Sequence, residues 1–127
     1  VLGGLDNTEE LLGILDIGVL CSESEGFSNT ILEYMAYGLP VIATRVGGNM
    51  EAVVDKETGY LVESHDSAGL ARAILALARN PAKRKEMGWR GRERIKAKFR
   101  ADRAVGECDA LFQSLIANHL AAPTKDR

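Results

Sequence analysis

The apolar residues in the first half of the chain fall into short, unbroken runs. Three of these runs have the length of a β-strand, at residues 17–20, 41–43 and 60–62. Polar segments with the start and stop residues of helices accompany them, over about 8–15, 30–37 and 49–54. Unbroken aliphatic strands that alternate with helices are typical of a parallel sheet covered on both faces.

Glycine, proline and asparagine set the predicted ends of these helices. Gly38 and Pro40 end the helix that begins near Thr30, because glycine favours a helix end and proline does not continue a helix. Asn49 follows Gly47 and Gly48, and we predict that its side chain caps the next helix.

The second half of the chain carries helical patterning alone. An apolar stripe at a spacing of 3.6 residues predicts a helix over about 67–79. Asn80 and Pro81 are typical of a helix start, and they open a basic helix that runs to about Phe99. A third helix, ending near Leu120, is predicted by a stripe at Val105, Cys108, Phe112, Leu115 and Ile116.

Together these elements predict an α/β fold. We expect a Rossmann-like, three-layer parallel sheet with about three core strands, followed by C-terminal helices. Residues 1–66 would form the sheet region, residues 67–120 a helical region packed on the same domain, and residues 121–127 a short tail.

Charge is distributed unevenly along the 127 residues, although the net charge is only −2. Residues 1–71 carry two cations and twelve acids, whereas residues 72–103 carry twelve cations and three acids. A basic block of this kind is able to meet nucleic acid or an anionic membrane surface. Its cations are interleaved with apolar residues at helical spacing, however, which favours a solvated helix face. We therefore expect no nucleic-acid partner.

Composition and residue spacing argue against several classes of protein: membrane-spanning, secreted and metal-binding. No apolar run reaches the roughly 18–20 residues that span a bilayer, and the first residues do not resemble a secretion signal. Cys21 and Cys108 lie far apart without metal-type spacing, and there are only two histidines. We expect a cytoplasmic protein without a bound metal.

The candidate chemistry lies where strands lead into helices. The loop at 25–30 runs directly into a helix start, whose free backbone amides and dipole suit a phosphate or diphosphate. Glu25 and Glu33 flank this start, but a solvated loop for Glu25 and a capping role for Glu33 are alternatives. Gly47 and Gly48 repeat the pattern after the next strand, with an ordinary glycine turn as the alternative. A hydrolase triad, a Gly-x-Gly-x-x-Gly fingerprint and a Walker loop find no support here.

Four linked motifs carry a resemblance to a known family. They are Ser24-Glu25-Gly26-Phe27, the run 32–44 (LEYMAYGLPVIAT), Gly47-Gly48-x-x-Glu51 and Gly59-Tyr60-Leu61-Val62. In this order they resemble the donor-binding half of the retaining GT-B glycosyltransferases of family four, also called glycosyl transferases group 1. The resemblance extends over nearly the whole chain and implies that the three strands are neighbours, as the fourth, fifth and sixth of a doubly wound sheet.

The resemblance also implies roles for individual residues. Glu25 would be the catalytic residue beside the transferred sugar, and Glu33 would bind the ribose hydroxyls of the nucleotide. Backbone amides of the helix start would hold the diphosphate without a metal or other cofactor. The implied donor-binding residues are Gly26, Phe27, Ser28, Asn29, Thr30, Ile31, Glu33, Gly47 and Gly48.

What the family does sets the expected function. The chain would bind the nucleotide-sugar donor of an enzyme that transfers a sugar with retention, in polysaccharide or glycolipid biosynthesis. A glycan or lipid-linked acceptor would be held by an N-terminal domain not contained in this chain, so we expect the chain alone to transfer nothing. The inner face of the membrane is a further candidate partner, through a peripheral contact.

Three alternatives compete with this interpretation. A GT-B epimerase shares the architecture but acts on its nucleotide sugar without an acceptor. A non-catalytic nucleotide-sugar-binding module would need Glu33 and the amides but not Glu25. A binder of nucleic acid or membrane surface would use residues 72–103, and its binding would weaken steeply with salt.

Overall fold

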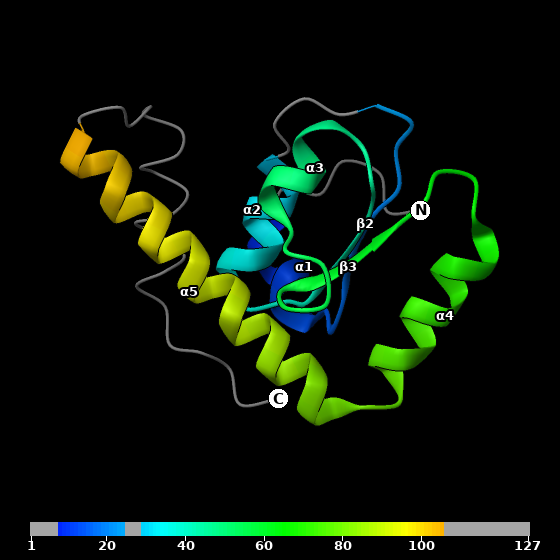
Figure 1. Cartoon of the computed structure of the whole chain (residues 1–127). Coiled ribbons are helices and arrows are strands. Elements are labelled where there is room, and N and C mark those ends of the chain that lie inside the picture. Colours follow the sequence, from blue (N-terminus) through cyan, green and yellow to red (C-terminus); the bar gives the residue numbers. More distant parts are fainter. Residues whose placement is uncertain (1–7, 25–28, 106–127) are drawn as a thin grey trace.

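Three parallel strands form the centre of the protein (Figure 1). The computed structural model describes residues 8–24 and 29–105. The strands pair in the order β1-β2-β3 and comprise β1 (Gly18–Leu20), β2 (Val41–Thr44) and β3 (Gly59–Val62). Both pairings are parallel, with Val19 opposite Ile42 and Ile42 opposite Tyr60. The predicted α/β class, the three strands and their adjacency are confirmed.

Five helices are described around this sheet. They are α1 (Thr8–Ile14), α2 (Asn29–Ala36), α3 (Gly47–Ala52), α4 (Ser67–Ala78) and α5 (Pro81–Val105). The basic helix continues beyond Phe99 and takes in Val105, which the sequence pattern had placed at the start of another helix. The rest of that predicted helix lies outside the described residues. Within the described residues, no helix is both long and apolar enough to cross a membrane.

The two faces of the sheet are covered by different helices. Val41 and Ala43 point to one face and join the cluster that includes α2 and α3, whereas Ile42 points to the other face and meets α4. In Figure 1, α4 accordingly lies on one side of the sheet, and α2 and α3 lie on the other. The whole of β2 is buried, as expected for a central strand with an unbroken apolar run.

The long helix α5 joins the two layers. Its Met87 belongs to the cluster on the α4 side of the sheet, and its Ile95 belongs to the cluster on the α2 side. Gly88 lies so close to the end of α2 that a Cβ atom there would meet the carbonyl oxygen of Gly38. Gly38 itself has φ +73°, the left-handed conformation that ends α2 where the sequence predicted.

The predicted cap of α3 is wrong. The helix begins at Gly47, two residues earlier than the predicted start, and Val46 occupies the capping position without a side-chain hydrogen bond. Asn49 is fully buried inside the helix, where its Nδ2 donates to the carbonyl oxygen of Thr44 at 3.0 Å. A tertiary hydrogen bond has therefore taken the side chain that local pattern assigned to a cap.

Arginines of the basic block bind the C-terminal carbonyls of the two preceding helices. Arg94 donates to the carbonyls of Ala52 and Glu51 at the end of α3, at 3.1 and 2.8 Å. Arg84 donates to the carbonyls of Leu77 and Ala78 at the end of α4, at 2.7 and 2.9 Å. A cation at a helix C-terminus satisfies free carbonyls and complements the helix dipole. These two arginines therefore link α5 to the ends of α3 and α4.

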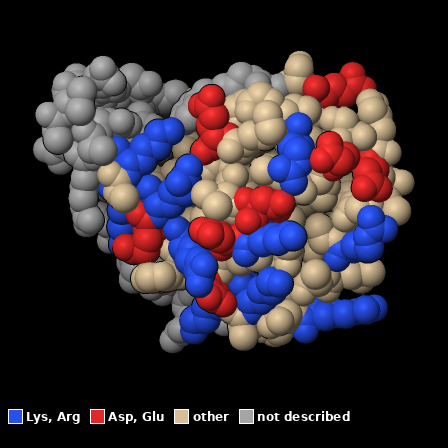
Figure 2. Space-filling view, in the orientation of Figure 1, with Lys and Arg blue, Asp and Glu red and all other residues tan. Residues whose placement is uncertain are grey.

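Acidic side chains accompany two other cations of the basic block. Figure 2 shows Lys and Arg interleaved with Asp and Glu over the visible described face. Arg90 pairs with Glu86 at 2.7 Å, and Lys96 pairs with Glu93 at 3.1 Å. The arrangement accords with the solvated helix face expected for this block.

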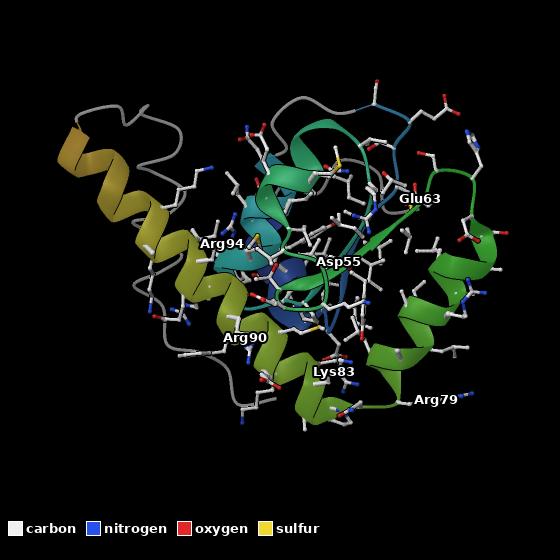
Figure 3. The ribbon with its side chains drawn as sticks, in the orientation of Figure 1. Asp55, Glu63, Arg79, Lys83, Arg90 and Arg94 are labelled. Carbon is white, nitrogen blue, oxygen red and sulfur yellow. The ribbon has the colours of Figure 1, made fainter. Side chains whose placement is uncertain are left out.

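We expect Arg94→Met to lower the free energy of unfolding by about 1 kcal/mol. The substitution removes the hydrogen bonds that Arg94 donates to two carbonyls at the end of α3, and the loss is modest because these groups are partly exposed to water. Arg79→Met is the matched control, since Arg79 points into solvent and has no side-chain partner among the described residues (Figure 3). Urea unfolding of both variants measures the difference. Equal losses would show that the contacts of Arg94 contribute nothing.

Candidate functional site

The candidate site lies at the edge of the sheet where β1 and β2 end. Because the strands are parallel, the chain leaves both at the same edge. It passes from β1 through residues 21–28 to the start of α2, and from β2 through Arg45 and Val46 to α3. The predicted residues Glu25, Gly26, Phe27 and Ser28 lie outside the described residues.

The start of α2 is open to solvent. Asn29 and Thr30, its first two residues, are exposed, as an anion site at this helix start requires. Ile31 is fully buried, and its side chain belongs to the core beside α2. Glu33 follows one turn later and is half-buried. The structure therefore places Glu33 near an accessible helix N-terminus, at the correct end of the sheet for a ligand.

Packing of Tyr34 fixes this helix against β1. A Cβ atom at Gly18 would collide with the Tyr34 ring, so the ring lies directly on the strand. Burial raises the pKa of the Tyr34 phenol above its usual value of 10.0, and the Glu33 carboxylate raises it further. The phenol thus stays neutral at physiological pH, and Glu33 is held next to a well-packed part of the helix.

The glycine pair lies on the neighbouring connection. Gly47 is exposed and has φ +42°, a left-handed conformation that favours glycine, whereas Gly48 is buried. Both follow the carboxyl end of β2, so they lie at the same edge of the sheet as the start of α2. The structure brings the two predicted parts of the site to one edge.

A hydrogen-bonded cluster that the sequence analysis missed connects these two parts. The Thr44 hydroxyl, at the end of β2, accepts from the Ser22 amide at 3.0 Å and donates to the Ser22 carbonyl at 2.7 Å. Asn49 in turn donates to the Thr44 carbonyl. Thr44 stands in a motif quoted for the family resemblance, but no local pattern indicates that its hydroxyl bonds a residue 22 positions away.

Arg45, which directly follows β2, is the cation closest in sequence to this edge. Its side chain forms ion pairs with two carboxylates. Its guanidinium lies 3.0 Å from Asp55 and 3.0 Å from Glu63, both of which are labelled in Figure 3. Asp55 also accepts from the Leu61 amide of β3 at 2.9 Å, so the ion pair supports the strand edge. Arg45 is therefore committed to structure, and an anion at the α2 start would depend on backbone amides.

A hollow of about 220 Å³ opens beside this cluster, toward α4. Its wall includes Cys21, Thr44, Glu63 and His65. Thr44 is the last residue of β2, and Cys21 and Glu63 directly follow β1 and β3. Among the described side chains, no three potential metal ligands come together.

Comparison with known proteins identifies the family. Residues 1–94 match the family described as glycosyl transferases group 1. The N-acetyl-alpha-D-glucosaminyl L-malate synthase of Bacillus anthracis is 37% identical over 115 residues, which make up 91% of this chain and 30% of that protein. This chain thus spans less than a third of the length of that relative.

Solved structures agree in fold. The C-terminal domain of the glycosyl transferase group 1 family protein LpcC from Francisella tularensis superimposes with a TM-score of 0.69 at 34% identity, over 77% of this chain and 52% of that one. Anabaena Alr3699/HepE, solved in complex with UDP, has a TM-score of 0.65 at 23% identity, over 92% of this chain and 30% of that one. The chain belongs to the glycosyl transferases group 1 family.

Proposed function

We propose that this chain is the donor-binding part of a GT-B glycosyltransferase that moves a sugar from a nucleoside diphosphate to an acceptor with retention. The observation that carries the proposal is the exposed start of α2 at the carboxyl edge of the sheet, with Glu33 on the same helix. Family membership supplies the class of reaction. The acceptor in this proposal is a glycan or glycolipid.

The chemistry of donor cleavage explains why a helix start suits this task. As the bond to the sugar breaks, the departing nucleoside diphosphate gains negative charge. Free amides at a helix N-terminus, with the helix dipole behind them, stabilise that charge without having to reorganise. In this proposal the amides of Ser28, Asn29, Thr30 and Ile31 hold the diphosphate, and no metal is needed.

The two carboxylates have separate tasks in the proposed reaction. Glu33 accepts hydrogen bonds from the ribose hydroxyls, which orients the nucleotide. Glu25 lies beside the transferred sugar, where a negative charge stabilises the developing positive charge of an oxocarbenium-like transition state. Gly26, Phe27, Gly47 and Gly48 complete the donor site.

Direct binding tests the proposal. The protein expressed from its complete gene is titrated with UDP in a calorimeter, because UDP is the nucleotide bound by HepE, which has the same fold. We expect saturable binding that is unchanged by a metal chelator, and release of UDP from a UDP-sugar when acceptor is added. Absence of binding to UDP and to other nucleoside diphosphates would contradict the proposal.

Product analysis distinguishes transfer from epimerisation. Nuclear magnetic resonance of the product is expected to show the sugar on the acceptor with the anomeric configuration of the donor. Conversion of the nucleotide sugar into an epimer without an acceptor would replace the proposal by the epimerase alternative.

A further inference from the structure

We propose that the hollow between α5 and the connection from α3 to β3 is a second binding site, which takes a neutral glycan by stacking a sugar ring on Trp89. The connection precedes β3, so the hollow lies at the amino edge of the sheet, opposite the candidate donor site. The inference goes beyond the proposed function, because binding in this hollow needs neither a nucleotide nor sugar transfer.

The hollow has the size of a ligand site. Its volume is about 550 Å³, within the range of roughly 300–1,000 Å³ that is usual for small-molecule sites. One wall is a stripe of α5 with Trp89, Arg90 and Glu93, and Val54 and Thr58 form part of the other wall. Figure 3 labels Arg90 along this stretch of α5. A hollow of this volume has room for a sugar ring beside the indole of Trp89.

Hydrogen bonds hold both walls in place. Arg94, which also lines the hollow, links α5 to the end of α3 through the carbonyls of Ala52 and Glu51. Thr58 is 4% exposed, and its hydroxyl accepts from the Val54 amide at 3.0 Å. The walls are thus formed before a ligand arrives, which lowers the entropy lost on binding.

Trp89 supplies the apolar surface of the site. It is the only tryptophan among the 127 residues, and it is 58% exposed. Among the described residues, none forms a hydrogen bond with its indole N–H. A pyranose ring carries C–H groups on its flat face, which pack against an aromatic ring, while the indole N–H can donate to a hydroxyl. A single exposed apolar side chain is ordinary, but an aromatic one that lines a hollow indicates a ligand.

Charged groups on the α5 wall occur in pairs of opposite sign. Arg90 Nη2 lies 2.7 Å from a carboxylate oxygen of Glu86, and Glu93 lies 3.1 Å from Lys96. The guanidinium of Arg90 has five N–H donors and Glu93 has two oxygens, so both keep hydrogen-bonding capacity for a ligand. Donors next to acceptors match sugar hydroxyls, which both donate and accept. A polyanion would gain little here, because its charges would meet carboxylates as well as cations.

Binding of neutral oligosaccharides to the protein expressed from its complete gene tests the inference. Maltoheptaose and chitopentaose are titrated in a calorimeter with UDP present, and we expect at least one of them to bind saturably. Trp89→Ala should weaken that binding by about 10-fold or more, because the stacking surface is lost. Trp89→Phe keeps an aromatic face, so the weakening should stay below about threefold.

Leu75→Ala is the matched control. Leu75 is an apolar side chain on α4 that is also exposed, at 46%, and it does not line the hollow. Since both residues are exposed on helix surfaces, neither substitution removes a core side chain, and both variants should fold. We expect Leu75→Ala to bind the oligosaccharides with wild-type affinity.

The fluorescence of Trp89 gives a second readout, at the site itself. The difference in emission between the wild type and Trp89→Phe isolates the signal of this one side chain. We expect this difference to change on titration with the same midpoint as the calorimetric binding, because a stacked sugar displaces water from the indole.

Four results would overturn the inference alone. They are absence of saturable binding of both oligosaccharides, equal affinities of Trp89→Ala and Leu75→Ala, a loss in Trp89→Phe as large as in Trp89→Ala, and unchanged Trp89 emission. Binding of vesicles of phosphatidylglycerol through Trp89, without binding of oligosaccharide, would replace the glycan by a membrane surface. Failure to bind any nucleoside diphosphate would overturn the proposed function and leave this inference standing, since the two sites lie at opposite edges of the sheet.

Discussion

Gly59→Ala is expected to lower the free energy of unfolding by about 3 kcal/mol or more, a large part of the roughly 5–15 kcal/mol that stabilises a domain. A Cβ atom at Gly59 would collide with the backbone of Val41. It would lie 2.8 Å from the carbonyl carbon of Val41 and 2.9 Å from the nitrogen of Val41. Val41 belongs to the central strand, is fully buried and packs in the cluster beside α2 and α3, so it has little room to move. Overpacking against backbone is costlier than overpacking against a flexible side chain.

Gly38→Ala separates this collision from the general effect of replacing a glycine. Gly38 has φ +73°, but no atom lies within 4 Å of the position that its Cβ would take. Its replacement should therefore cost about 1–2 kcal/mol, from backbone conformation alone. Denaturant unfolding of both variants measures the difference. A Gly59→Ala protein as stable as Gly38→Ala would mean that the two strands tolerate a wider spacing.

The second large effect is expected from Glu25→Gln, which should lower kcat by about 100- to 1000-fold, the range found when one electrostatic contact to a transition state is removed. Glutamine keeps the shape but not the charge that the proposal assigns to stabilising the sugar cation. The Kd for UDP should stay near the wild-type value, because UDP lacks the sugar that Glu25 is proposed to contact.

Glu33→Gln should show the reverse pattern. Loss of charged hydrogen bonds to ribose hydroxyls would weaken UDP binding by about 10- to 100-fold. Glu57→Gln is the control, because Glu57 is exposed and precedes β3, away from the candidate site. Calorimetry with UDP and initial rates of transfer measure the two quantities. Wild-type transfer by Glu25→Gln would favour a spectator role for that carboxylate, as in a non-catalytic binding module.

Local pattern was sufficient for the three strands and for the start of α5. The three strands appear within a residue of the predicted ranges, because each contains a short apolar run of strand length. The start of α5 was predicted equally well: the Asn80 side chain accepts from the Lys83 amide at 3.0 Å, as its sequence position indicates. Capping bonds of this kind span three residues, so sequence spacing alone reveals them.

The candidate site was predictable only in part. Sequence order placed the start of α2 and the Gly47-Gly48 turn after neighbouring strands, which determines that they share an edge. The pattern assigned Asn49 wrongly to a helix cap, because a buried amide chooses among all polar groups that the fold brings near, and Thr44 offered a partner on another element. Arg45 was likewise left without a role until Asp55 and Glu63 were seen beside it.

By itself, the sequence determined the family, the α/β class, the strand positions and the approximate positions of most described helices, because these follow from periodicity, short-range capping and linked motifs. The tertiary structure decided the hydrogen bonds between Thr44 and Ser22, the contact of Arg94 with the end of α3, and the close approach of the strands that requires glycine at position 59. Each of these joins groups 18 to 43 residues apart. The free energy of each of these contacts depends on how close two groups lie in space. Composition and spacing along the chain do not specify that distance.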